Sequence, residues 1–486
     1  MVTVSEVISL VNGYIYDSNN IFDLYIQMFS FLDKHQSIVL RDIVDNIDKH
    51  IKYRLLVDEI LENDDFIIAF SEKNKKSILE ILDNNKEDIF VLIISLFASI
   101  DEVFGNQNYS SSKKESDLLE RIVHIDCLNT EKTYNFGKVF YKTPSLLEKL
   151  YDYHTDFIRR SSEIEYSIKS FQNRLLIYQE PQTDYKVSLS KIECPYVNGM
   201  LSREYEPIKI ALVPLTGKLD YLEFHEIGNK FFLEKLNYEE QYKQKVMDIL
   251  DKLALEKANI VIFPEMVFSD YILNSVKKYL NENKGRFSLI IAGTIWKNKK
   301  NECVILSGDG IELTRQLKLN PYHKTPNLQN EGNNEGIIVT EGNKIINILD
   351  IDSIGRFVTP ICVDFISEGY YGEMKNMGVN LSFVPAYTSS LTAFMTNANR
   401  LGTDNYGSTF VCNCCIPMIN KQHQNEANKH GCSDVSFVSV PLKRKKVGSM
   451  SFNIPNENIC DCGNRKLCYF LVNFSKRSCE FKQVRV

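Results

Sequence analysis

Apolar and polar residues follow two different patterns along the chain, and the change between them divides the sequence in two. In residues 1–180 the apolar positions recur at helical spacing, as in residues 20–34. One face of that segment collects the apolar side chains of Ile21, Leu24, Tyr25, Met28 and Leu32. Residues 76–104 and 144–178 predict two longer helices. Only one of the 13 prolines and three of the 22 glycines fall in residues 1–180, so the first part is expected to be a helical domain.

The second part, residues 208–486, alternates short apolar runs with amphipathic helices. Near-continuous apolar runs are typical of strands covered on both faces, and they occupy residues 208–214, 259–265, 288–296 and 303–307. Helical connectors are predicted at 238–257 and 269–281. Further strands are predicted at 312–319, 337–340, 345–350, 357–362, 380–385, 408–414, 433–440 and 467–473. The second part is therefore an α/β layered domain of about twelve strands. Residues 181–207 are irregular and are interpreted as a linker or lead-in strand.

Composition and charge exclude several classes of protein. A 44% hydrophobic and 25% charged share is ordinary for a globular protein. The charge balance, 57 − 63 = −6, does not favour a nucleic-acid binder. The longest apolar run, residues 89–100, is too short to cross a bilayer, and the first residues lack a secretory signal. The 12 cysteines are unevenly spaced, which favours reduced thiols. We expect a soluble cytoplasmic protein without a membrane partner.

Three side chains with catalytic chemistry follow predicted strands, where ligands collect in open α/β sheets. They are Glu265, Lys318 and Cys362. Each has a plain alternative: a glutamate at a helix start, a solvent-facing lysine and a buried apolar thiol. Together they form an acyl-transfer set, in which a thiol attacks, a carboxylate moves protons and an ammonium stabilises an oxyanion. Cys362 precedes a predicted helix, which favours thiolate character.

The order and spacing of these residues resemble the nitrilase or carbon–nitrogen hydrolase superfamily. The resemblance begins with a strand ending in Phe-Pro-Glu265 and continues with Asp309-Gly310 before Lys318 and with Ile361-Cys362-Val-Asp364. Residues 378–386, 405–413 and 431–441 match later segments of the family in the same order. The resemblance spans residues 208–486, and its motifs are short.

By resemblance, the fold is a four-layer α-β-β-α sandwich, usually paired into a homodimer or larger homo-oligomer. Glu265 is then the general base, Lys318 the oxyanion stabiliser and Cys362 the nucleophile, with the backbone N–H of Val363 completing the oxyanion hole. Family members often carry a second glutamate after the lysine. Glu335 is favoured over Glu331 for that position, and Lys318 over Lys324 for the lysine. The run after Cys362, Phe365-Ile-Ser-Glu368-Gly-Tyr-Tyr, departs from the family pattern.

The resulting hypothesis is a cysteine hydrolase that acts on a small-molecule amide or, less favourably, a nitrile, with no metal or organic cofactor. Two alternatives stay open: a catalytically silent or signalling module, and transfer of the acyl group to an amine by the same three residues. The thiols Cys412, Cys414 and Cys415 lie in an apolar strand and are interpreted as core residues. Residues 1–180 carry no recognised chemistry; capping the pocket, binding a protein partner and setting the assembly state are their candidate roles.

Overall fold

The computed structural model describes most of the chain, in segments separated by gaps. The described residues are 3–18, 21–62, 70–105, 122–124, 138–141, 175–178, 184–192, 208–215, 222–323, 334–339, 344–351, 355–388, 390–405, 407–414, 436–441, 449–453, 468–474 and 479–485. They fall into two compact units. Helices α1–α6 with strands β2 and β3 form the first, and strand β1 with everything from β4 onward forms the second.

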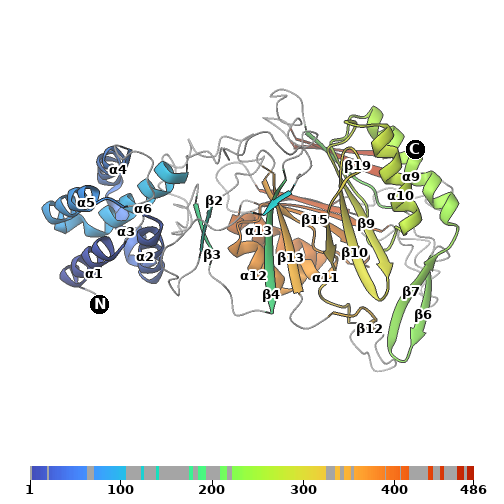
Figure 1. Ribbon diagram of the computed structural model, residues 1–486, viewed down its shortest axis with the longest axis horizontal. Helices are drawn as coiled ribbons and strands as arrows, with labels where there is room; N and C mark the ends of the chain where they lie inside the picture. The colour runs from blue at the N-terminus through green and yellow to red at the C-terminus, as the bar shows by residue number, and fades with distance from the viewer. Residues whose placement is uncertain are drawn as a thin grey trace. The chain divides into compact units, whose positions relative to one another are not determined.

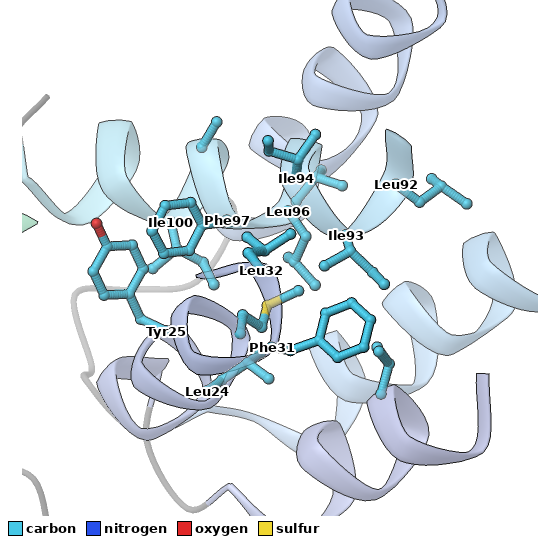
Figure 2. Close-up of a cluster of buried hydrophobic side chains, with 14 of the residues drawn as sticks. Leu24, Tyr25, Phe31, Leu32, Leu92, Ile93, Ile94, Leu96, Phe97 and Ile100 are labelled. Carbon is cyan, nitrogen blue, oxygen red and sulfur yellow. The ribbon is translucent and has the colours of Figure 1, made fainter. Parts of the chain in front are cut away.

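The first unit is built from six α-helices. They are α1 (Val4–Asp17), α2 (Ile21–Lys34), α3 (Gln36–Asp45), α4 (Ile47–Glu62), α5 (Glu72–Asn84) and α6 (Ile89–Gly105). The apolar faces of α2 and α6 meet in the core, where Tyr25 stacks on Phe97 with ring centroids 4.4 Å apart (Figure 2). The helical character predicted for this part of the chain is thus present, and the helix expected at residues 20–34 is α2.

Two of the helix predictions for this unit are wrong in detail. Residues 76–104 do not form one helix, because Asn85 ends α5 with φ −133° and its side-chain amide donates to the Ile81 carbonyl. A single 3-10 turn, Lys86–Asp88, separates it from α6. An asparagine side chain competes for backbone hydrogen bonds, so it favours such a break. The predicted helix 144–178 ends in strand β3 (Leu175–Tyr178), which pairs with β2 (Lys138–Tyr141); residues 144–174 lie outside the described residues.

Two large mixed sheets form the second unit. The strands of the eight-stranded sheet are, in spatial order, β1 (Ile122–His124), β4 (Tyr185–Ile192), β13 (Lys344–Ile351), β14 (Gly355–Val358), β15 (Leu381–Ala386), β16 (Ser408–Asn413), β17 (Ser436–Pro441) and β18 (Ser449–Asn453). Those of the seven-stranded sheet are β11 (Glu312–Leu317), β10 (Lys300–Ser307), β9 (Leu289–Lys297), β8 (Ile260–Ile262), β5 (Ile208–Leu212), β19 (Cys468–Phe474) and β20 (Cys479–Arg485).

Helices cover the outer faces of both sheets, which gives four layers (Figure 1). Helices α9 (Glu239–Leu255) and α10 (Asp270–Glu282) bury their apolar faces against β8, β9 and β10. On the other side α12 (Glu368–Asn376) contacts β4, and α13 (Thr392–Asn405) contacts β16, β17 and β18. The sheets meet through β5 with β16 and β9 with β15. The layered α/β fold predicted from the sequence is confirmed.

Several strands differ from the prediction. Residues 337–339 form no strand, and Thr340 lies outside the described residues. Residues 181–207, interpreted as a linker or lead-in, contain β4, which pairs in parallel with β13. The hairpin of β6 (Leu222–Ile227) and β7 (Lys230–Leu236) was missed; with β12 (Asn334–Glu335) it forms a small three-stranded sheet. Gly228, in the left-handed region at φ 60°, marks its turn and was the available signal.

Among the described helices, none is both long and apolar enough to span a membrane.

Candidate active site

The structure brings Glu265, Lys318 and Cys362 together, although they lie far apart in the sequence. Strands β8 and β9 are parallel, β10 runs opposite to β9, and β11 runs opposite to β10. β11 therefore points the same way as β8, so the residues that follow these two strands lie at one edge of the sheet. Glu265 follows β8 and Lys318 directly follows β11. Both side chains are almost fully buried.

Lys318 lies between two carboxylates. Its Nζ is 2.7 Å from Oε1 of Glu265 and 2.7 Å from Oε2 of Glu335. Glu335, the favoured second glutamate, is held at β12 by the backbone N–H of Tyr322, which donates to its Oε2 at 2.8 Å. An ammonium has three N–H donors, and these carboxylates take two of them. Among the described residues no third acceptor is found for Nζ, so the third donor can serve a ligand oxygen.

Cys362 reaches the same place from the other sheet. Its backbone N–H donates to the Pro385 carbonyl at the end of β15, and its Sγ lies 3.9 Å from the Tyr387 carbonyl oxygen. The backbone N–H of Glu265 donates to the Ala386 carbonyl at 3.4 Å and so joins the two sheets at this edge. Cys362 has φ 49° and ψ −110°, a strained conformation for a residue with a side chain. The surrounding turn therefore holds the thiol in a conformation that the free chain avoids.

The two carboxylate oxygens of Glu265 differ in their hydrogen bonds. Oε1 accepts hydrogen bonds from Lys318 and from the Asn301 amide, at 2.7 and 2.8 Å. Oε2 is buried and makes no hydrogen bond of ordinary geometry within the described residues. Burial raises the pKa of Glu265 overall, and the nearby Cys362 thiol makes a smaller, opposing contribution. Glu265 is thus a carboxylate base close to the thiol.

Burial and charge set the protonation states of the cluster. Burial raises the pKa of Glu265, and the neighbouring Glu335 raises it further against the opposing charge of Lys318. Burial alone would lower the pKa of Lys318, but Glu265 and Glu335 raise it, so the side chain stays an ammonium. Burial and then the Glu265 charge raise the pKa of Cys362. This direction is opposite to the one predicted from the helix start: helix α11 (Val363–Ile366) is a single turn, whereas the thiol is buried.

Sequence reasoning missed Asn301, which completes this cluster. Its side-chain amide donates to Glu265 and lies 3.5 Å from Oε1 of Glu335, while its backbone carbonyl accepts from the N–H of Lys318 at 2.8 Å. Asn301 lies near the start of β10, which is antiparallel, and so reaches the edge where β8 and β11 end. No sequence signal distinguishes this asparagine from other polar residues at the start of a strand.

Asp364 connects the Lys318 segment to the Cys362 segment. Its buried carboxylate accepts hydrogen bonds from the backbone N–H of Leu319 and from both the backbone and side-chain N–H of Asn320. A carboxylate that accepts several N–H donors is held firmly in place. Asp364 was part of the motif quoted for the resemblance, but no role was assigned to it.

The remaining sequence predictions have different outcomes. Val363 begins α11, so its backbone N–H has no acceptor within the helix; its place in an oxyanion hole stays a prediction. Glu331 and Lys324 lie outside the described residues, as does Cys415. The other two thiols of that group are buried, as expected for core residues: Cys412, and Cys414, whose Sγ lies 3.3 Å from the Glu265 carbonyl. Glu368, in the run that departs from the family pattern, forms an exposed ion pair with Arg400.

No group of His, Cys, Asp and Glu side chains suited to a metal ion occurs among the residues that the structure covers.

The sequence matches no protein-family model and no curated protein. Solved structures do match. Half of the chain is similar in fold to nitrilase-superfamily proteins. Nit3 of Saccharomyces cerevisiae, a member of branch 10 of the nitrilase superfamily, has 16% identity and a TM-score of 0.32, over 51% of this chain and 91% of its own. An amidase from Nesterenkonia sp. has 11% identity and a TM-score of 0.35, over 56% and 92%.

The NitFhit protein of C. elegans has 15% identity and a TM-score of 0.35, over 51% of this chain and 61% of its own. Helices α1–α6 lie outside the matched part. At this level of similarity, any activity has to be argued from this chain's own side chains.

Proposed function

We propose that this protein is a cysteine hydrolase of non-peptide C–N bonds, acting most readily on a linear amide through a thioester intermediate. One observation carries the proposal: the buried Glu265 carboxylate is bonded through Oε1 to Lys318, its Oε2 has no hydrogen-bond partner within the described residues, and the backbone N–H groups of Glu265 and Cys362 donate to the neighbouring carbonyls of Ala386 and Pro385. A base, a cation and a nucleophile are thereby available to one carbonyl group.

In the first half-reaction, Cys362 Sγ forms a bond to the amide carbon while its proton moves to Glu265. The third N–H of Lys318 and the backbone N–H of Val363 donate to the oxyanion that develops on the carbonyl oxygen. Collapse of this intermediate breaks the C–N bond, and Glu265 returns its proton to the leaving ammonia or amine. The product on the protein is a thioester.

In the second half-reaction, Glu265 takes a proton from water, whose oxygen bonds to the thioester carbon. The C–S bond breaks, the carboxylic acid leaves, and the proton returns to Cys362. The raised pKa of Glu265 suits this exchange, because it makes the carboxylate a stronger base for the thiol and water protons. Glu335 and Asn301 position Lys318 and Glu265 and need not touch the substrate.

Acid quenching followed by mass spectrometry of the full-length protein tests the proposal. The protein is incubated with a panel of amides and nitriles, and the expected result is a mass increase of one acyl group on the peptide that contains Cys362. Cys362→Ala should show no increase. If no compound leaves an adduct on the wild type, the protein is a silent or signalling module. If the adduct is released only when an amine is added, the protein is an acyltransferase.

A further inference from the structure

A tyrosine that precedes the predicted hydrolase region reaches both segments that carry the catalytic side chains. Tyr185 is the first residue of β4 and pairs with Lys344 on β13. Its hydroxyl donates to Oδ1 of Asn320 at 2.9 Å and lies 3.2 Å from Oγ of Ser367. Asn320 is two residues after Lys318, and Ser367 lies between α11, which follows Cys362, and α12.

Asn320 passes this contact on to the nucleophile segment. Its backbone and side-chain N–H groups each donate to Oδ1 of Asp364 at 2.8 Å. Asp364 is two residues after Cys362. The result is a continuous chain of hydrogen bonds from Tyr185 through Asn320 to Asp364, which joins the end of the Lys318 strand to the turn of Cys362.

Packing fixes the direction of the Tyr185 hydroxyl. The ammonium of Lys344 lies over its ring at 5.2 Å from the centroid, and Tyr370 meets the ring edge-on at 6.0 Å. Gly369 approaches so closely that a Cβ there would lie 2.7 Å from the ring. A ring held on these sides keeps its place when the hydroxyl is removed, so the hydroxyl can be tested separately.

We propose that Tyr185 is a positioning residue for the catalytic centre. Its hydroxyl aligns Asn320, and through Asn320 and Asp364 it sets the placement of Lys318 relative to the Cys362 thiol. This assignment rests on the proposed function for its catalytic meaning. It also means that the catalytic unit begins at β4 and includes a strand in the segment interpreted as a linker.

The test is the rate at which iodoacetamide alkylates Cys362 in the full-length protein, followed by peptide mass spectrometry. The Lys318 charge favours the thiolate of Cys362, which is the form that reacts with iodoacetamide. A misplaced Lys318 ammonium therefore slows alkylation. Loss of one hydrogen bond predicts a rate about threefold to tenfold lower for Tyr185→Phe at pH 8. The matched control is Tyr371→Phe on α12, which removes a hydroxyl that donates to Asp404 on α13 at 3.0 Å and should leave the rate unchanged.

A second variant separates positioning from a general loss of structure. Asn320→Ala removes the residue that links Tyr185 to Asp364 by hydrogen bonds. It should slow alkylation of Cys362 at least as much as Tyr185→Phe does. The double variant Tyr185→Phe/Asn320→Ala should then be no slower than Asn320→Ala alone, whereas independent structural damage would add. A rate for Tyr185→Phe within twofold of the wild type, a faster rate, additive effects, or a wild-type Cys362 that is not alkylated at pH 9 would each overturn the proposal.

The labelling needs no substrate, so the two proposals can fail separately. If no amide or nitrile gives an adduct but Tyr185→Phe still slows labelling, the hydrolase function fails while the positioning role stands. If an adduct forms and labelling is unaffected by Tyr185→Phe, only the positioning role is lost.

Discussion

The buried ammonium of Lys318 offers the sharpest test of the site's electrostatics. Replacing it in Lys318→Met keeps a long apolar stem but leaves Glu265 and Glu335 without their shared cation. At 2.7 Å and an effective dielectric of about 20, each ion pair is worth about 6 kcal/mol of attraction. Most of this offsets the desolvation of three buried charges, so we expect a net loss of about 3–5 kcal/mol in the free energy of unfolding at pH 7.

The same substitution should make stability depend on pH. Burial already raises the pKa of Glu265 against the opposing charge of Lys318, and without that cation it rises further. A carboxyl group whose pKa is higher in the folded than in the unfolded protein stabilises the fold only while it is protonated. The free energy of unfolding therefore falls as pH rises above the pKa of the unfolded state. The deficit of Lys318→Met should therefore shrink between pH 7 and pH 5.

Urea unfolding followed by tryptophan fluorescence measures the loss in the free energy of unfolding in the unit that contains Lys318. Trp296, the single tryptophan, lies on β9 beside the cluster of Leu222, Leu233 and Met266, so it reports on the unit that contains the site. The matched control is Lys277→Met, which breaks a pair with Glu312 of the same 2.7 Å length but with side chains about 27–29% exposed. That control should cost at most about 1 kcal/mol. Equal losses for the two variants, or a Lys318→Met deficit independent of pH, would refute the reasoning.

The other predictions concern neighbouring side chains of the same cluster. Cys362→Ala should abolish turnover and acyl-adduct formation at a stability cost of about 1 kcal/mol, since only a small buried group is lost; wild-type turnover would assign the nucleophile to another cysteine. Glu265→Gln should bind substrate normally but lose kcat, and an unchanged kcat would exclude Glu265 as the base. Asn301→Asp replaces a donor to Glu265 with a third carboxylate and should destabilise the protein by about 2–3 kcal/mol at pH 7, less at pH 5; a loss equal at both pH values would show that charge is not the cause.

Some features of this protein could not be found in local patterns. Asn301 looks like any polar residue at the start of a strand, and only the reversal of β10 relative to β9 and β11 carries it to the edge where Glu265 and Lys318 lie. Tyr185 precedes the motifs by many residues, and only the parallel pairing of β4 with β13 places it beside Asn320. The break at Asn85 and the high pKa of Cys362 likewise depend on side-chain bonding and burial.

The sequence by itself determined which segments form apolar strands and amphipathic helices, because burial on a given face fixes the residue types that recur there. It also determined the chemical identity of Glu265, Lys318 and Cys362, together with their positions after strands. The tertiary structure decided that these three groups meet, that Glu335 and Asn301 join them, and that burial raises the pKa of the thiol. Strand direction, sheet order and local dielectric arise from contacts between residues far apart in the chain, and no local pattern encodes them.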